Sequence, residues 1–274
     1  MITIKEFPKK TFQSKEEMFK VLKEEKNTLI AQKKMITKEA DAVVFVSQVE
    51  DIKGNIFKAD AVDVSDVNKL RLKVVINTTN LMDSHSDVHF KGLWKKSVKE
   101  KKDFYLLQEH IMKFNHIISD NVKASVVLMN WSDLGQNYPG KTEALVFDVE
   151  IDKRNEFMFN QYAKGYVKNH SVGMRYVKLE LAINSESKWD VEEKEIWDKY
   201  IDDIANKEVA EERGYFWAVT EAKIIEGSAV PIGSNTITPT LEVEAKNNEP
   251  SKDTHKQQEA EKSLQDRKEF LLNN

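Results

Sequence analysis

Lys168-Asn-His-Ser-Val-Gly-Met-Arg-Tyr-Val177 alternates between two kinds of side chain. Every second residue from Val172 to Tyr176 is apolar or aromatic, and the residues between them are small or polar. Neighbouring side chains of a strand point to opposite faces, so this pattern predicts a β-strand with one buried face. Ser171 and Gly173 lie on the other face, where the glycine leaves space for a substrate backbone or a developing oxyanion. The stretch therefore predicts a strand that presents a serine hydroxyl beside open space.

Further strands are predicted where Val, Ile, Leu and Phe cluster. These strands are Leu70–Asn77, Phe104–Leu107, Ala124–Met129, Glu143–Ile151, Tyr215–Val230 and, near the N-terminus, Ala42–Val46. Helices are predicted at Lys91–Lys101 and at Glu156–Val167, the second ending near Gly165. Strands that are interrupted by helices, without regular β-α-β alternation, favour an α+β fold.

Composition divides the chain into segments. We expect a helical and strand extension at 1–68, a main domain at 69–240 with an acidic helical insertion at 186–213, and a charged, disordered tail at 241–274. The first helix is predicted from Ser14 and Glu17, which match a capping box. Gly214 is placed to end the helical insertion. Docking of that amphipathic insertion onto its own chain is the favoured interpretation.

Composition also excludes several classes of protein. The 274 residues are 40% hydrophobic and 32% charged, which is enough apolar material for a core. A net charge of −4 argues against a nucleic-acid partner held by phosphate contacts. The absence of cysteine excludes disulfides, thiol nucleophiles and thiolate metal sites, and it suits a reducing cytoplasm. No apolar run reaches membrane-spanning length, and the first residues lack a signal-peptide core, so we expect no membrane partner.

Two other segments carry groups able to activate a serine. The apolar run that starts at Phe104 ends in Gln108-Glu-His110, which predicts a strand that delivers an imidazole at its end. The last predicted strand contains Glu226-Gly-Ser-Ala-Val230 and so supplies a carboxylate. A serine hydroxyl is a poor nucleophile until a base takes its proton and a third group orients that base.

These segments, in this order, resemble the prohead maturation proteases of tailed phages. Upstream, Asp83-Ser-His-Ser-Asp-Val-His-Phe-Lys-Gly-Leu-Trp-Lys-Lys-Ser97 looks like that family's Asp-x-x-Gly-Asp-x-x-x-x-Gly-x-x-x-x-Ser element, and the resemblance covers about residues 70 to 238. The chain departs from the pattern at Ser86, in place of glycine, at Ile111, where aspartate often follows the histidine, and at Ile118-Ser119, in place of Ile-Gly. None of these departures removes a proposed catalytic group.

The resemblance implies a mainly antiparallel β-barrel ringed by helices, as in the herpesvirus assemblins. It implies a serine endopeptidase without a cofactor, packaged in the assembling prohead in the host cytoplasm. There the enzyme would cleave the scaffold protein, the N-terminal segment of the major capsid protein, and itself. The comparison with assemblins also suggests a homodimer.

By the same resemblance, Ser171 is assigned as nucleophile, His110 as general base and Glu226 as the acid that orients it. Glu221 is the alternative acid, although on a regular strand it would project to the opposite face from Glu226. His116 is the alternative base.

Two residues near the predicted serine have roles outside the predicted catalytic triad. His170 should face away from Ser171 along the strand, so we predict that it is not catalytic. Arg175 shares the serine's face and is hypothesised to add positive field there.

Three other interpretations stay open. Asp83, His85, Asp87 and His89 would share one face of an extended segment and offer metal ligands, although a polar loop is the favoured interpretation. A scaffold or assembly protein that keeps the fold but has lost cleavage is the main competitor. An unrelated bacterial hydrolase is disfavoured because no Gly-x-Ser-x-Gly motif is present.

Overall fold

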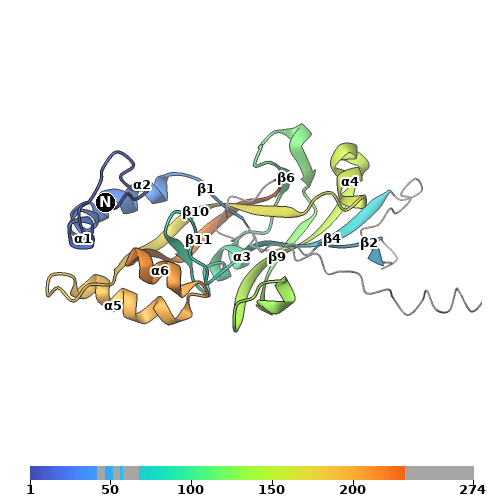
Figure 1. The fold of residues 1–274 in the computed structure, drawn as a ribbon. Coiled ribbons are helices and arrows are strands. Elements are labelled where there is room, and N and C mark those ends of the chain that lie inside the picture. Colours follow the sequence, from blue (N-terminus) through green and yellow to red (C-terminus); the bar gives the residue numbers. More distant parts are fainter. Residues whose placement is uncertain (42–46, 52–55, 58–67, 232–274) are drawn as a thin grey trace, which may run out of the picture. The chain divides into compact units, whose positions relative to one another are not determined.

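Two β-sheets dominate the computed structural model, which describes residues 1–41, 47–51, 56–57 and 68–231 (Figure 1). The first sheet has the order β1 (Lys38–Asp41), β10 (Asn169–Ile183), β11 (Tyr215–Val230), β6 (Leu106–Gln108) and β7 (Ile117–Ser119), with β5 (Asp87–His89) also paired to β11. The second has the order β3 (Ile56–Phe57), β2 (Ser47–Asp51), β4 (Lys69–Thr78), β9 (Lys141–Asp152) and β8 (Val122–Asn130). Only β5 and β6, which run parallel to β11, depart from antiparallel pairing in the described part.

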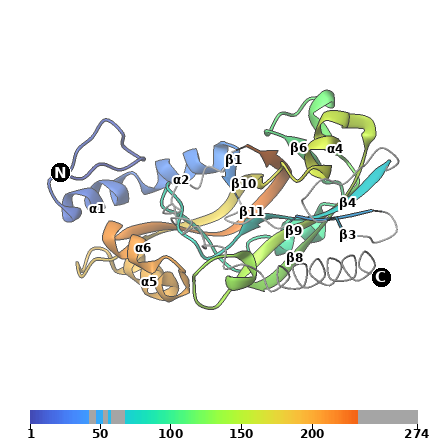
Figure 2. The same ribbon diagram turned by 45° about the vertical axis from the view of Figure 1, so that its right-hand side comes forward.

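The long strands β10 and β11 form the antiparallel pair on which the site is built (Figure 2). Ser171 lies opposite Ser228, and Gly173 lies opposite Glu226. The next pair is Met174 with Ile224, so one residue of β11 is extra at this point and forms a β-bulge. A bulge reverses the alternation of a strand. Ile224 therefore turns into the core with Met174, while Glu226 and Ser228 stay on the face of Ser171.

A hydrophobic core fills the space between the two sheets. The predicted apolar face of β10, represented by Val172 and Met174, is fully buried in it. On β11, a Cβ atom at Gly227 would come within 2.7 Å of Phe147 Cε2 and 3.1 Å of Ile76 Cδ1, both from the second sheet. Glycine at this position therefore lets the two sheets approach closely.

Helices surround the sheets; some contribute to this core, and others pack with Phe216 in a separate hydrophobic cluster. They are α1 (Lys15–Glu24), α2 (Lys26–Met35), α3 (Lys95–Glu100), α4 (Glu156–Ala163), α5 (Val191–Tyr200) and α6 (Lys207–Arg213), with short 3-10 turns η1 (Phe114–His116), η2 (Ser132–Leu134), η3 (Lys153–Asn155) and η4 (Ile201–Asp203). Ser14 caps α1 as predicted, because its hydroxyl accepts the N–H of Glu17. The Glu17 carboxylate accepts from the N–H of Gln13 rather than from that of Ser14.

The predicted helical insertion is present as α5, η4 and α6, and it docks onto its own chain. Trp197 of α5 is buried against Phe216 of β11, with ring centroids 5.2 Å apart. Trp189, just before α5, is 74% exposed. Gly214 ends α6 in the left-handed conformation, with φ of 77°.

The predicted α+β class is confirmed, and each predicted strand that falls on described residues is present. The two sheets do not close into one barrel within the described ranges. The helix predicted over Lys91–Lys101 is shorter, since only Lys95–Glu100 is helical. The predicted strand Ala42–Val46 and the tail 241–274 lie outside the described residues. No helix in the described part is long and apolar enough to cross a membrane.

Replacing Gly214 by alanine should destabilise the fold more than the same change at Gly135. Both glycines have positive φ, so a Cβ costs about 1–2 kcal/mol at each. At Gly214 the added Cβ would also lie 2.9 Å from Phe19 Cζ, whereas nothing lies within 4 Å at Gly135. Urea unfolding of the two variants measures the difference. An equal loss at both positions would contradict the close packing of Phe19, from α1, against Gly214 at the end of α6.

Candidate active site

His110 lies in a tight turn that follows β6. The N–H of Ile111 donates to the carbonyl of Gln108 at 3.0 Å, and both central residues, Glu109 and His110, have positive φ of 54° and 59°. This is the pattern of a type I′ turn, which favours glycine and asparagine. Each non-glycine residue in it costs about 1–3 kcal/mol, and such strain tends to cluster at functional sites.

Hydrogen bonds to β11 hold this turn in place. The backbone N–H of Glu109 donates to the carbonyl of Ala229 at 2.9 Å, and that of His110 donates to Ser228 Oγ at 3.1 Å. The turn is therefore fixed against the strand that carries Glu226.

The imidazole of His110 contacts the carboxylate of Glu226. His110 Nδ1 lies 2.6 Å from Glu226 Oε1, and the second oxygen, Oε2, accepts a hydrogen bond from Ser228 Oγ at 2.6 Å. Glu226 is buried. A carboxylate at Nδ1 holds the ring proton on that nitrogen, so Nε2 is left able to accept a proton. Of the two candidate acids, Glu226 is the one that the structure places on the histidine.

Ser171 lies one strand away on the same face. Directly opposed residues of an antiparallel pair have neighbouring side chains, so Ser171 is adjacent to Ser228. The Ser171 side chain is fully buried, and its hydroxyl has no hydrogen-bond partner. A hydrogen bond between Ser171 and His110 is therefore not formed in this structure. Catalytic hydrogen bonds often tighten only when substrate binds.

An unpartnered buried hydroxyl is unfavourable by about 1–3 kcal/mol, so it needs an explanation.

The role of Gly173 differs from the predicted one. A Cβ atom at this position would lie 2.9 Å from Glu226 Cδ and closer still to Oε1. The space left by the glycine is thus filled by the carboxylate of Glu226 and is not open to a substrate. The strand β10 is paired on both edges here, with β1 and β11, so the amides near Gly173 lie within sheet ladders. Both observations count against the predicted oxyanion hole at Gly173.

Lys101, which the sequence reasoning missed, supports the bulge beside Glu226. Its ammonium donates to the carbonyls of Ile224, at 3.2 Å, and of Ile225. Burial lowers the pKa of Lys101, and the nearby charge of Glu226 acts in the opposite direction. Nothing in the sequence distinguishes Lys101 from the other lysines around it, because the bulge that it contacts is more than 120 residues away.

Glu221 and Arg175 do not join the site. Glu221 pairs with Lys96 of α3 at 3.0 Å. The bulge at Ile225 and one further register shift separate it from Glu226, so the alternation expected for a regular strand does not apply to this acid. Arg175 is exposed.

His170 and the alternative base, His116, have other surroundings. His170 points to the opposite face from Ser171, as predicted, and its Nε2 lies 2.8 Å from the hydroxyl of Tyr162. Burial lowers the pKa of His170 to about 4, so the ring is neutral. His116 lies in η1, and its Nδ1 is buried without a hydrogen-bond partner.

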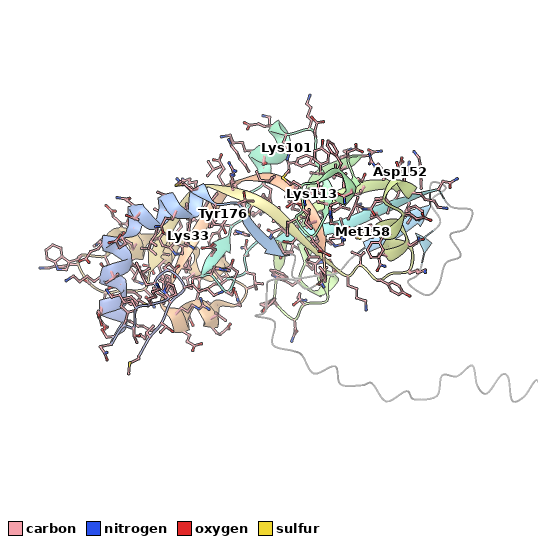
Figure 3. All side chains as sticks on the ribbon, turned by 90° about the horizontal axis from the view of Figure 1, so that it is seen from above. Lys33, Lys101, Lys113, Asp152, Met158 and Tyr176 are labelled. Atoms are coloured by element: carbon pink, nitrogen blue, oxygen red, sulfur yellow. The ribbon has the colours of Figure 1, made fainter. Side chains whose placement is uncertain are left out.

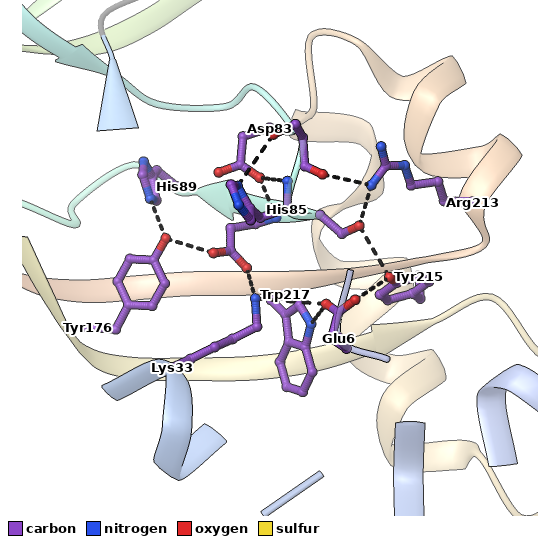
Figure 4. A network of polar contacts seen from close by, with 12 residues as sticks. Glu6, Lys33, Asp83, His85, His89, Tyr176, Arg213, Tyr215 and Trp217 are labelled. Carbon is purple, nitrogen blue, oxygen red and sulfur yellow. Dashed lines mark hydrogen bonds and ion pairs between the residues drawn. The ribbon is translucent and has the colours of Figure 1, made fainter. Parts of the chain in front are cut away.

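The predicted metal candidates belong instead to a polar network that joins α2, β5, β10, α6 and β11 (Figure 4). Lys33 of α2 and Tyr176 of β10, both labelled in Figure 3, reach the carboxylate of Asp87, at 2.5 and 2.9 Å. His89 Nε2 lies 3.1 Å from the Tyr176 hydroxyl. Asp83 Oδ1 accepts the backbone N–H groups of two later residues of its turn. No group of three or more metal ligands occurs among the described residues.

The same network ties the N-terminal segment to the first sheet. The carboxylate of Glu6 accepts hydrogen bonds from Trp217 Nε1 at 2.8 Å and from the Tyr215 hydroxyl at 2.9 Å. It also lies 3.8 Å from Lys33 Nζ. A paired and buried network of this kind makes the fold rigid.

Comparison with known proteins adds no further assignment, since no family model, curated protein or solved structure matches this chain. The roles considered below therefore depend on the geometry of these residues and on the sequence motifs.

Substituting Gly173 by alanine tests how Glu226 is seated. The glycine backbone is not in the left-handed region, so alanine is tolerated there except for its clash with the carboxylate. We expect a loss of about 1–3 kcal/mol in the free energy of unfolding. In a Glu226→Ala background the obstructing carboxylate is gone, and Gly173→Ala should cost much less. Additive losses in this double-mutant cycle would contradict the proposed packing.

Asp83→Asn should change how stability depends on pH. Burial, followed by the charge of Asp87, raises the pKa of Asp83 from 3.8 to about 7. The folded protein thus holds this proton more tightly than the unfolded chain, and the resulting stabilisation is lost as pH rises through about 7. The asparagine variant keeps an oxygen acceptor without the charge, so its stability relative to wild type should grow between pH 5 and pH 8. Thermal unfolding measures this, with the exposed Asp198→Asn variant as control. A constant difference across this range would contradict the assignment.

Proposed function

We propose that this protein is a serine endopeptidase of the kind that matures the proheads of tailed phages. The observation that carries the proposal is the 2.6 Å contact between His110 Nδ1 and Glu226 Oε1. These two residues are 116 positions apart, and each comes from a different motif of the family pattern. A histidine oriented by a buried carboxylate, with a serine on the same face of the sheet, is the set of groups that acyl transfer requires.

In the proposed mechanism the Ser171 hydroxyl attacks the carbonyl carbon of the scissile peptide bond. His110 Nε2 takes the hydroxyl proton, and Glu226 stabilises the imidazolium that forms. The imidazolium then gives its proton to the leaving amine, and the peptide C–N bond breaks. Water, activated by the same histidine, hydrolyses the acyl-enzyme and restores the serine.

The burial of Ser171 fits an enzyme whose activity is restricted. A fully buried hydroxyl can meet a peptide only after a local opening of the structure. Such latency suits a protease that is packaged with its substrates and acts at high local concentration inside an assembling particle. The proposed substrates are the scaffold protein, the N-terminal segment of the major capsid protein, and the enzyme itself, in the host cytoplasm. We include in the proposal a relationship between this two-sheet fold and the assemblin barrel, and a homodimer.

The competing proposal is an assembly protein that keeps this fold without cleavage. One observation favours it, namely that the Ser171 hydroxyl forms no hydrogen bond with His110. In that case the His110–Glu226 pair would serve only to fix the strained turn against β11.

Co-expression with the major capsid and scaffold proteins separates the two proposals. Wild type should process its substrates, whereas Ser171→Ala, His110→Ala and Glu226→Gln should each lose about 10³-fold or more of the cleavage rate, because a triad acts as a unit. Glu221→Gln, whose side chain faces α3, is the matched control and should process normally. Mass spectrometry of the products gives the new termini. Unprocessed proteins with wild type would favour the assembly role, and normal turnover with Ser171→Ala would contradict the protease.

A further inference from the structure

The face of the first sheet that carries Ser171 continues past the catalytic groups to a pair of cations. On β10, Val172 and Met174 are fully buried in the core. Neighbouring residues of a strand point to opposite faces, so Ser171, Gly173 and Arg175 share the other face. Arg175 is exposed and lies about 13 Å from Ser171 along the strand, at about 3.3 Å per residue. A peptide that follows this face in extended form therefore passes Arg175 about four residues from the bond that Ser171 attacks.

Lys223 of β11 lies directly opposite Arg175 and is also exposed. The next pair towards the site, Met174 with Ile224, is buried, so the two cations lie on the outer face. Opposed residues of an antiparallel pair have neighbouring side chains, and like charges at such positions repel each other. Neither cation forms an ion pair within the described ranges. The two strands thus hold two positive charges side by side.

Elsewhere the described strands place opposite charges across from each other. Three cations of β4 lie opposite three acids of β9, namely Lys69, Arg71 and Lys73 opposite Asp152, Glu150 and Asp148. Lys178, the next lysine of β10 after the cation pair, lies opposite Glu221. Arg175 with Lys223 is the one pair of like charges at opposed positions among the described strands. Two cations held together at the edge of a site attract a ligand of negative charge.

A cavity of about 250 Å³ adjoins Lys223, between β11 and the helix α3. Its lining includes Ile225, the extra residue of the bulge, which directly precedes Glu226. Lys101, which follows α3 and is labelled in Figure 3, also lines it. The cavity therefore connects the surroundings of Glu226 with the cation pair.

The two other lysines that line the cavity are already engaged. Lys96 pairs with Glu221 at 3.0 Å and also interacts with Glu100. Lys101 donates to backbone carbonyls of the bulge. Lys223 is therefore the lysine at this cavity whose charge is open to a ligand, and the arginine opposite it adds a second charge.

We propose that Arg175 and Lys223 form a substrate subsite for an acidic side chain, about four residues from the scissile bond. An aspartate or glutamate carboxylate between the two cations would accept charge-assisted hydrogen bonds from both and remove their repulsion. Arg175 and Lys223 thus determine specificity and touch none of the reacting atoms. This inference rests on the proposed endopeptidase function and names the class of peptide that the enzyme recognises.

Binding can be measured apart from cleavage in the full-length Ser171→Ala chain, because both cations are exposed without any opening of the site. The probes are two blocked decapeptides of alanine and serine that differ at one central residue, aspartate or asparagine, and NMR titration gives their affinities. The aspartate peptide should bind about fivefold tighter or more at low ionic strength, and added salt should reduce that preference. Arg175→Gln and Lys223→Gln should each remove most of the preference and leave binding of the asparagine peptide unchanged.

Lys123→Gln is the matched control, since Lys123 is an exposed lysine of β8 that lies opposite Asp148 in the other sheet. It should keep the full preference for the aspartate peptide. Equal binding of the two peptides to the Ser171→Ala chain, or a preference that survives Arg175→Gln combined with Lys223→Gln, would overturn the subsite.

A second readout separates this inference from the proposed function. In the co-expression assay, the Arg175→Gln/Lys223→Gln double variant should slow processing at sites that have an acidic residue about three to five positions from the scissile bond, and spare other sites. Cleavage of all sites at unchanged rates would refute the subsite and leave the protease standing. Preferential binding of the aspartate peptide without any cleavage by wild type would refute the protease and keep an acidic-peptide site.

Discussion

The candidate site depends on the seating of one buried carboxylate. Glu226 can lie across β10 only because residue 173 has no side chain, and a methyl group there would occupy the place of its Oε1 atom. From this position the carboxylate accepts from Ser228 and contacts His110, so one group fixes both the strand and the turn. A slip of one residue in the pairing of β10 with β11 would turn Glu226 to the other face. The register of this strand pair is therefore the constraint from which the rest follows.

Two unfavourable local conformations accompany that constraint, and each has identified partners. The bulge at Ile225 breaks the alternation of β11, and the ammonium of Lys101 binds the carbonyls around it. The turn at Glu109 and His110 places two non-glycine residues in the left-handed region, and hydrogen bonds to β11 hold it there. Strain that the surroundings support in this way is characteristic of sites where a side chain must be aimed accurately. The backbone is thus locally unfavourable at the place where the chemistry is proposed.

Much of this arrangement could be predicted from the sequence. The alternation of side chains predicted β10 and its buried face. The family resemblance assigned His110 and Glu226 to one site. The role of Gly173 could not be predicted, because the carboxylate that occupies the place of its missing side chain belongs to Glu226 on another strand. The bulge was hidden for the same reason, since the run Lys223-Ile-Ile-Glu226 is compatible with a regular strand. Lys101 acts through backbone carbonyls, which leave no trace in the side-chain pattern. A closed barrel was an expectation from resemblance, and within the described ranges the strands form two sheets.

The central claim is that Ser171 is a hydroxyl activated by the histidine that Glu226 orients. The most direct measurement is covalent labelling of the full chain with an alkyl fluorophosphonate, which modifies activated serines, followed by peptide mass spectrometry. It should be done on the isolated protein and on protein assembled with capsid and scaffold proteins. The account predicts an adduct on Ser171, strongest in the assembled state, absent after His110→Ala and not found on Ser228. Absence of the adduct in both states, or equal labelling of Ser171 without His110, would contradict it.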